Sequence, residues 1–421
     1  MLLTSTPSVY NASITPSNLP WDTYNYCNAP HVNLDHYSFP NESGARLRFV
    51  VVVMRHHKRT PDNLYLSERT LNPITGWDCS SIIPQSYAGG TAQIFTETST
   101  PFLHPFADRI WAGTCDSGQL TREGLDDAIK HGRDFWGVYH DRLGFLEHVN
   151  EKEIYVRTST EPRTQQAAGA MLYGMDPNTA SKQWPVYMQP DIIDSLVPNY
   201  ACPVAGQLRA EAQAMSSWMD HLVQHESLQR RLDETLGTTG LDAWNSWYDH
   251  FFDTFTARTC HGHPLPCNVS GACVSQEDAK MVFSIGDWEY NYIFNDAPQA
   301  SQYVKLTFGV FFAELADTLR HVHVVGVQGR PKHKLHMYVG HDGSMVRLAA
   351  GLGLGRANGL RWPAMGSEIV MEVWHASDDI AYMRILREGS PAPPPLDWIL
   401  LSEFIQLLED LVPESLGVLC G

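Results

Sequence analysis

The run from Leu47 to Met54 (Leu-Arg-Phe-Val-Val-Val-Val-Met) constrains the fold more than any other segment of this chain. A short β-branched run without polar alternation is typical of a strand that is covered on both faces of a sheet. A second strand of this kind, at 153–158, leads into a predicted helix from about Pro162 to Tyr173. Strands followed by helices indicate parallel pairing with covered faces. We therefore expect an α/β fold with a mainly parallel central sheet flanked by helices.

The character of the sequence changes along its length and indicates three regions. The first part is rich in Pro, Asn, Ser and Tyr and lacks periodicity, whereas 203–300 has amphipathic helical patterns and no strong strand. After residue 300 the alternation of helix and strand returns. We expect an extended N-terminal arm at 1–45, an α/β domain formed by 46–202 and 301–421, and an inserted, mainly α domain at 203–300.

Charge and hydropathy exclude two classes of partner. The chain has 30 basic and 47 acidic side chains, which gives a formal net charge of −17 at pH 7. Nucleic-acid binding requires clustered Lys and Arg, so this acidic excess argues against a nucleic-acid partner. The longest apolar run, Phe49–Met54, is far shorter than the roughly 18 residues that a membrane span needs. Neither the net charge nor the apolar runs indicate the oligomeric state.

The cysteines and glycosylation sequons favour the secretory pathway. Three acceptor sequons occur, at Asn11, Asn41 and Asn268, and the cysteine count is even at eight. The first residues have neither a basic stretch nor a sustained apolar stretch, so we expect a secreted protein whose signal peptide has been removed. The alternative is a cytosolic protein with reduced, buried thiols.

The densest group of cysteines follows residue 259, where Cys260-His261-Gly262-His263 precedes Cys267 and Cys273. Zinc needs four converging nitrogen or sulfur ligands, and this group contains enough of them. However, two prolines interrupt the group, and its spacing matches no common zinc pattern. We therefore favour local disulfides over a metal site, although the pairing cannot be deduced from sequence.

Charged residues follow the first buried strand directly, in the order Met54-Arg55-His56-His57-Lys58-Arg59-Thr60-Pro61. In open α/β sheets, ligands bind at the carboxyl ends of the strands. Arginine pairs two oxygens of a phosphate at once, and a histidine beside it can act as a nucleophile. This segment therefore predicts an anion site that contains a nucleophile.

Two other strand ends carry residues of the same kind. Arg157 lies at the end of the strand at 153–158, and His341-Asp342 follow a strand predicted at 333–339. Charged side chains are rarely buried without partners, so several guanidiniums that meet at one edge need an anion between them. We expect these side chains to share one crevice.

The stretch Arg-His-x-x-Arg-x-Pro at 55–61 resembles the signature of the histidine acid phosphatases, the branch that includes phytases and prostatic-type acid phosphatases. The resemblance extends to Gln119-Leu120-Thr121-x-x-Gly124, to the block at 155–160 and to Gly340-His341-Asp342, in family order. It implies an α/β domain with a mainly α domain inserted in it, and an enzyme that hydrolyses small phosphomonoesters.

The resemblance also implies a role for each site residue. It makes His56 the nucleophile that forms a phosphohistidine and Asp342 the acid that protonates the leaving alcohol. The phosphate would be bound by Arg55, Arg59, Arg157 and His341. Neither a metal nor another cofactor is implied, so EDTA should leave activity intact. Because Asp342 must be protonated, we expect an optimum at about pH 4–6.

His57 departs from the family pattern, because the residue after the nucleophile is normally Gly. Strand alternation would turn His57 to the face opposite His56, where it packs, but a direct effect on substrate is the alternative. A second departure is Gly343, where close relatives often have Thr.

His57 therefore keeps a second function open: a phosphatase-fold protein that has lost this activity. Such a protein would serve in binding, or would use the same pocket for acid–base chemistry on a non-phosphate substrate. A branch similar to the phosphoglycerate mutases is disfavoured by the His-Asp block and the large helical insert.

Overall fold

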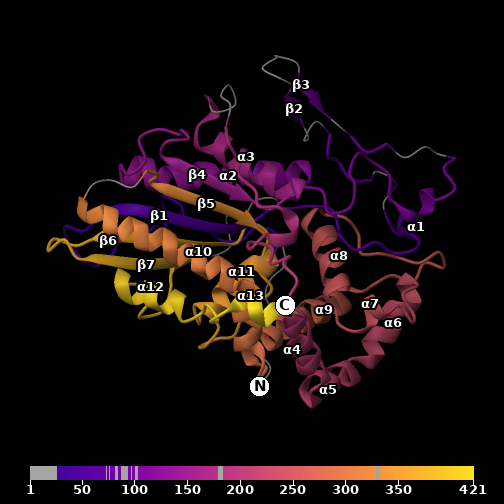
Figure 1. Ribbon diagram of the computed structural model, residues 1–421. Coiled ribbons are helices and arrows are strands. Elements are labelled where there is room, and N and C mark those ends of the chain that lie inside the picture. Colours follow the sequence, from indigo (N-terminus) through magenta and orange to yellow (C-terminus); the bar gives the residue numbers. More distant parts are fainter. Residues whose placement is uncertain are drawn as a thin grey trace.

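The computed structural model describes residues 26–421 except 73, 75, 81–83, 87–92, 96, 100–102, 179–183 and 329–331. Most of the expected N-terminal arm, including the sequon at Asn11, lies outside the described residues. Within the described part, the sequence folds around one large sheet with helices on both faces (Figure 1).

Among the described residues, seven strands form the central sheet, in the order β4-β5-β1-β6-β7-β8 with β9 also paired to β7. β1 and β4 run parallel to β5, whereas β6 and β7 continue the sheet in antiparallel fashion. The α/β class is confirmed, and the parallel pairing lies in the half that carries the predicted site. The strands are β1 (Arg46–Arg55), β4 (Ile154–Thr158), β5 (Leu335–Gly340), β6 (Glu368–His375), β7 (Ala381–Arg387), β8 (Ser390–Pro391) and β9 (Ile399–Leu400).

The apolar run in β1 is buried because helices cover both faces of the sheet. Val50, Val52 and Met54 pack in the core beneath α2 (Arg122–Trp136) and α3 (Pro162–Met175). The alternate residues, Phe49, Val51 and Val53, face the core on the other side. That second face is covered by α10 (Ala300–Gln328), α11 (Asp342–Gly351) and α12 (Leu401–Glu409). Because both faces are covered, the strand is apolar at every position from Phe49 to Met54.

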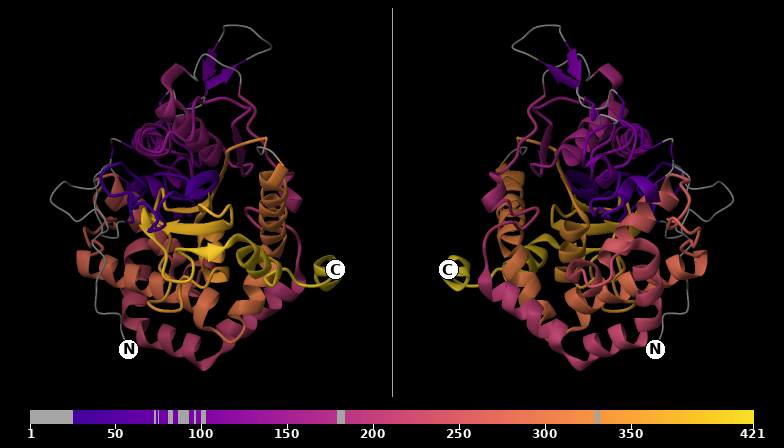
Figure 2. Two further views of the ribbon diagram at one scale, coloured as in Figure 1. Left: turned by 90° about the vertical axis from the view of Figure 1, so that its left-hand side faces the viewer. Right: turned by 90° about the vertical axis from the view of Figure 1, so that its right-hand side faces the viewer.

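Six described helices between α3 and α10 pack together beside the sheet, at the lower right of Figure 1 and along the lower edge of Figure 2. Their core is largely aromatic and includes Trp218, Tyr248 and Phe251, each 1% exposed or less. The helices are α4 (Pro203–Ala214), α5 (Ser216–Gln224), α6 (Glu226–Leu236), α7 (Asp242–Asn245), α8 (Asp249–Cys260) and α9 (Gln276–Asn291), followed by η5 (Tyr292–Asp296).

Shorter elements complete the described chain. They are α1 (Glu68–Leu71), β2 (Pro84–Ser86), β3 (Gln93–Phe95), η1 (Ala107–Arg109), η2 (Gly137–Arg142), η4 (Asp191–Ile193) and α13 (Leu416–Cys420). No described helix is both long enough and apolar enough to cross a membrane.

All eight cysteines form disulfides, which are Cys27–Cys260, Cys79–Cys115, Cys202–Cys420 and Cys267–Cys273. The group after residue 259 therefore offers no thiolate to zinc, because each of its cysteines is oxidised. Only one of its disulfides is local, since Cys260 pairs with Cys27 in the N-terminal segment. Four disulfides are typical of proteins that fold in an oxidising compartment.

Candidate active site

The carboxyl ends of β1 and β5 bring two predicted site residues side by side. Arg55 pairs in register with Gly340, and the backbone N–H of His56 donates to the Gly340 carbonyl at 3.1 Å. The next residue on each strand is a histidine, and the rings of His56 and His341 lie 5.3 Å apart in an edge-to-face arrangement. Parallel pairing thus positions both imidazoles at one edge of the sheet.

His56 is held with one ring nitrogen oriented by the backbone. Its Nδ1–H donates to the carbonyl oxygen of His57 at 2.8 Å, which leaves the lone pair on Nε2. The side chain is almost fully buried. Burial, followed by the charges of Arg163 and Arg55, holds the pKa of His56 well below its usual value. The imidazole is therefore neutral, as a nucleophile must be.

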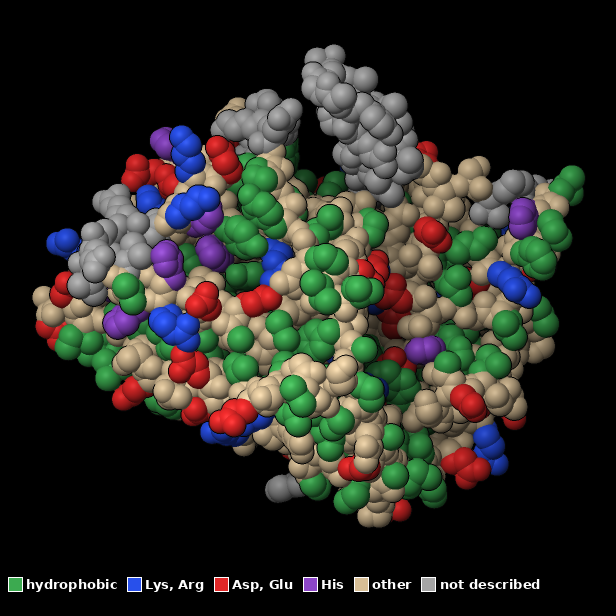
Figure 3. Space-filling model, viewed as in Figure 1, with side chains coloured by type: hydrophobic (Ala, Val, Ile, Leu, Met, Phe, Trp, Pro, Cys, Tyr) green, Lys and Arg blue, Asp and Glu red, His purple; other side chains and the backbone are tan. Residues whose placement is uncertain are grey.

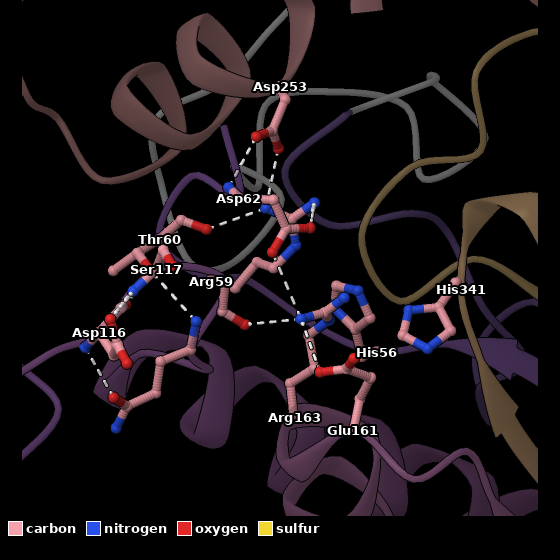
Figure 4. Close-up of polar contacts among 12 residues, drawn as sticks. His56, Arg59, Thr60, Asp62, Asp116, Ser117, Glu161, Arg163, Asp253 and His341 are labelled. Atoms are coloured by element: carbon pink, nitrogen blue, oxygen red, sulfur yellow. Dashed lines mark hydrogen bonds and ion pairs between the residues drawn. The ribbon is translucent and has the colours of Figure 1, made fainter. Parts of the chain in front are cut away.

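Three guanidiniums surround His56. Arg55 extends from the end of β1 and donates Nη1 to the Pro363 carbonyl at 2.5 Å. Arg59 lies on the following loop and donates Nη1 to the Thr60 carbonyl at 2.9 Å. The third is Arg163, from the first turn of α3, which lies between Arg59 and His56 in Figure 4. The structure therefore brings Arg55 and Arg59 together with His56, as the sequence predicts.

Arg157 is not part of this group, contrary to the expectation that it faces the shared crevice. Its guanidinium lies 2.5 Å from Glu314 and 3.1 Å from Asp194, and it stacks near the rings of Phe311 and Tyr338. Within β4, Arg157 points to the face covered by α10, because alternate strand residues face opposite sides. It ties β4 to α10.

Arg163 takes the place that the sequence analysis gave to Arg157. Pro162 starts α3, so the next residue lies in the first turn at the helix N-terminus. Helix N-termini that follow buried strands face the ligand edge of an α/β sheet and attract anions. The sequence signal that could have identified Arg163 is therefore its place in the first turn of α3, directly after Pro162, and not the end of β4.

Asp342 follows His341 at the start of α11. Its Oδ2 accepts from Arg55 Nη2 at 2.9 Å and from Trp362 Nε1 at 3.0 Å, and its Oδ1 accepts from the Gly343 N–H at 2.7 Å. Burial opposes its ionisation, but Arg55, Arg59 and His341 together hold the pKa of Asp342 below its usual value. The carboxyl is thus positioned by three donors.

His341 is oriented by a hydroxyl. Its Nε2 lies 2.9 Å from Ser159 Oγ, which also contacts the hydroxyl of Thr164 at 2.9 Å. Burial and the neighbouring Arg163 lower the pKa of His341 to about 3. A neutral His341 can donate a hydrogen bond from one nitrogen while it accepts one at the other.

The Gln-Leu-Thr block holds the loop after His56. The Thr60 N–H donates to the Gln119 carbonyl at 2.9 Å, and the Thr121 N–H donates to the Lys58 carbonyl at 3.1 Å. A Cβ on Gly124 would come within 2.0 Å of the same Lys58 oxygen, so this position requires glycine. The block therefore fixes the backbone that carries Arg59.

A sequence model of the histidine phosphatase superfamily (branch 2) matches residues 46–387. The chain belongs to this superfamily. Counting factor 60 of Dictyostelium discoideum is 25% identical over 86% of this chain and 84% of its own length. Lysosomal acid phosphatase of Bos taurus is 26% identical over 71% of each chain. The solved structure of Hafnia alvei phytase with myo-inositol hexakis sulphate has a TM-score of 0.58 at 14% identity, covers 89% of this chain and 99% of its own, and shares the fold.

In this histidine phosphatase, the His57 ring packs against Gly366 and His131. A Cβ on Gly366 would come within 2.9 Å of the ring, and Nε2 of His57 contacts Nδ1 of His131. The side chain is 1% exposed. The imidazole that replaces the family's glycine therefore packs in the protein interior, as strand alternation favours.

Two aspartates that sequence reasoning missed complete the histidine phosphatase site. Asp62 Oδ2 lies 2.9 Å from Arg59 Nη2, and Asp253 Oδ1 lies 2.8 Å from Arg59 Nη1. Asp253 belongs to α8, and its Oδ2 also accepts from the Asp62 N–H at 2.8 Å. The helical region thus contributes directly to the surroundings of the phosphatase motif. No pattern in the sequence of α8 distinguishes Asp253 from its neighbours.

Proposed function

We propose that this histidine phosphatase is an acid phosphomonoesterase that acts through a phosphohistidine on His56. The observation that carries the proposal is the position of His56, which is neutral and buried, with the charges of three guanidiniums acting on it. One of these guanidiniums, that of Arg55, also contacts the carboxyl of Asp342. Phosphoryl transfer requires an in-line nucleophile and positive charge around the oxygens of the transferring group. These residues can supply both.

In the first step, Nε2 of His56 attacks the phosphorus while the bond from phosphorus to the alcohol oxygen breaks. Asp342 gives its proton to that oxygen, so that a neutral alcohol leaves. The three guanidiniums bind the non-bridging oxygens, with Arg163 in the role that the resemblance had given to Arg157. His341, held by Ser159, is a further donor to the phosphoryl group.

In the second step, water attacks the phosphorus of the phosphohistidine. The Asp342 carboxylate accepts a proton from this water, and the bond from phosphorus to nitrogen breaks. His56 returns to its neutral form, and inorganic phosphate is released. The same carboxyl therefore acts first as acid and then as base.

The proposed chemistry agrees with an acidic optimum, at about pH 4–6. The lowered pKa of His56 favours its neutral form, in which the lone pair is available. The neighbouring guanidiniums lower the pKa of Asp342 in the free protein. A bound phosphate dianion raises that pKa again, because like charges oppose the ionisation of the carboxyl. Asp342 is thus protonated in the complex at acidic pH.

The alternative of a phosphatase fold without phosphatase activity loses its main support. That alternative rested on the bulk of His57 beside the phosphate, but the ring packs against Gly366 and His131. We also propose that 203–300 is a cap inserted into the α/β domain, because its helices pack together and reach the site through Asp253. Four disulfides and a lysosomal relative support a secretory location.

The test is the release of p-nitrophenol from p-nitrophenyl phosphate at pH 5, with and without EDTA. His56→Ala should abolish turnover, while His36→Ala, which alters an exposed histidine before β1, should retain it. After an alkaline quench, mass spectrometry should find phosphate on the peptide that contains His56. A folded protein that releases no phosphate from any monoester, or a His56→Ala variant with full activity, would overturn the proposal.

A further inference from the structure

Each guanidinium around His56 already faces a carboxylate. The ion pairs join residues from β1, the following loop, the start of α3, α8 and the start of α11. They are Arg55–Asp342 at 2.9 Å, Arg59–Asp62 at 2.9 Å, Arg59–Asp253 at 2.8 Å, Arg163–Asp62 at 3.3 Å and Arg163–Glu161 at 3.3 Å. A phosphoryl group must therefore share these cations with carboxylates that are present before it binds.

The charges of this cluster do not sum to a surplus of positive charge. Three guanidiniums stand against four carboxylates, and His56 and His341 are neutral because burial lowers the pKa of each. Arg347, whose Nη1 donates to the Gly343 carbonyl at 2.9 Å, brings the sum only to zero. Lys58 is turned toward α2, where its ammonium lies 3.3 Å from Asp127.

The carboxylates differ in where they lie. The side chains of Arg59 and Asp253 are each 6% exposed, whereas those of Asp62 and Glu161 are 34% and 48% exposed. The exposed pair thus lies on the solvent side of the guanidiniums, where the alcohol part of a substrate enters. In the space-filling view, acidic side chains gather in the recess between the sheet and the helical region (Figure 3).

One phosphoryl group fits this arrangement better than several. The first phosphate meets the guanidiniums, and the proton on Asp342 removes one of the opposing charges. A second phosphate or a carboxylate on the same alcohol would instead meet the exposed carboxylates of Asp62 and Glu161, whose charge repels it. A neutral alcohol meets no such repulsion, and a cationic alcohol is attracted.

We infer that the site selects singly phosphorylated esters of neutral or cationic alcohols and discriminates against polyanionic substrates. This inference rests on the proposed phosphomonoesterase function and adds the substrate class. Glu161 is the specificity-determining residue that can be altered most cleanly, because its carboxylate contacts Arg163 from the exposed side and lies outside the proposed chemistry.

The experiment compares kcat/KM at pH 5 and low ionic strength for compounds that differ in the charge of the alcohol. Phosphocholine has a cationic alcohol, glycerol 2-phosphate a neutral one and 3-phosphoglycerate an anionic one, while inositol hexakisphosphate has many phosphates. We expect kcat/KM for 3-phosphoglycerate to be about tenfold below that for glycerol 2-phosphate, and lower still for inositol hexakisphosphate. Added salt should reduce these differences in kcat/KM, because salt screens the charges of the exposed carboxylates of Asp62 and Glu161.

A charge series at position 161 separates an electrostatic role from a steric one. Glu161→Gln should raise the ratio of 3-phosphoglycerate to glycerol 2-phosphate activity about threefold, and Glu161→Lys should raise it further. Glu403→Gln, which removes an exposed carboxylate from α12, is the matched control and should leave the ratio unchanged. If Glu161 only fills space, the ratio of the two activities should not change in step with the charge of the residue at position 161.

The outcomes separate this inference from the proposed function. Hydrolysis of glycerol 2-phosphate with equal or better kcat/KM for the polyanions overturns the inference and leaves the phosphomonoesterase function standing. The inference also fails if the ratio does not respond to the charge at position 161. Hydrolysis of p-nitrophenyl phosphate but of none of the four compounds overturns the inference alone, whereas a folded protein that hydrolyses none of the five overturns both.

Discussion

The Nε2 atom of His57 lies 3.2 Å from Nδ1 of His131, so the residue after the proposed nucleophile belongs to a buried polar chain. The chain continues from His131 Nε2 to Glu368 Oε2 at 3.0 Å, and Glu368 Oε1 accepts from the Val32 N–H at 2.7 Å. The ring of His31 stacks on His131 with centroids 4.1 Å apart. This chain connects the loop after β1 with α2, β6 and the N-terminal segment.

The first prediction concerns His57→Gly. The variant should lose about 2–4 kcal/mol of stability, because it leaves a cavity beside Gly366 and an unpaired nitrogen on His131. The backbone carbonyl that accepts from His56 remains, so kcat and KM for p-nitrophenyl phosphate should stay within about twofold of the parent values. Thermal unfolding and steady-state kinetics check this. A normal melting temperature with a large fall in kcat would show that the ring acts on catalysis.

Glu368→Gln tests the ionisation of the same buried chain. Burial raises the pKa of Glu368 to about 7, above its ordinary value of 4.5. The folded protein therefore binds this proton more tightly than the unfolded chain, and the stability present below about pH 4.5 is lost as the pH rises toward 7.

The variant keeps a hydrogen-bonding side chain without an ionisable group. It should match the parent at pH 4.5 and exceed it at pH 8, by up to roughly 3 kcal/mol. Urea unfolding at both pH values measures the difference between the two proteins. The prediction would be wrong if the free energies of unfolding of the variant and the parent differed by the same amount at pH 4.5 and at pH 8.

Alanine substitution should lower activity at Arg163 and stability at Arg157. Arg163→Ala removes a phosphate ligand in the proposed reaction, so kcat/KM should fall by about 10²–10³ with little change in melting temperature. Arg157→Ala leaves Asp194 buried without its cation and should destabilise the fold by about 3–5 kcal/mol. Activity and melting temperature measured on both variants test this assignment, and the reverse pattern would restore Arg157 to the site.

Asp342→Asn tests the general acid. The amide is close in shape to the carboxyl but has no proton to give to the leaving oxygen. The rate of alcohol release should fall by about 10²–10⁴ for glycerol 2-phosphate, which has a poor leaving group. The fall should be much smaller in the first turnover of p-nitrophenyl phosphate, because p-nitrophenolate leaves without a proton. Equal losses for both substrates in single-turnover measurements would argue against this role.

The strands and long helices of this chain could be predicted because their patterns are local. The run at 47–54 matches β1, the strand expected at 153–158 matches β4, and the helix expected from about Pro162 to Tyr173 matches α3. The motif of the candidate site was readable for the same reason, since His56 and His341 directly follow strands whose burial is visible in the sequence. The antiparallel half of the sheet was less visible, because strand direction depends on connections rather than composition.

Contacts between distant segments could not be predicted in the same way. Asp253 reaches Arg59 only because α8 packs against the loop after β1, and nothing in α8 indicates that packing. The choice between Arg157 and Arg163 depended on which side of β4 faces α10. That choice is decided by tertiary packing, since Arg157 lies near the end of β4 and Arg163 lies in the first turn of the helix that follows it.

Two of the cross-links impose an order on biogenesis. Cys27 bonds to a cysteine 233 positions later, and Cys202 to one 218 positions later, at Cys420. A nascent chain that emerges from the ribosome in order cannot close the first until Cys260 has emerged, or the second until Cys420 has emerged. Cys27 and Cys202 must therefore be kept from other partners while more than two hundred further residues are synthesised.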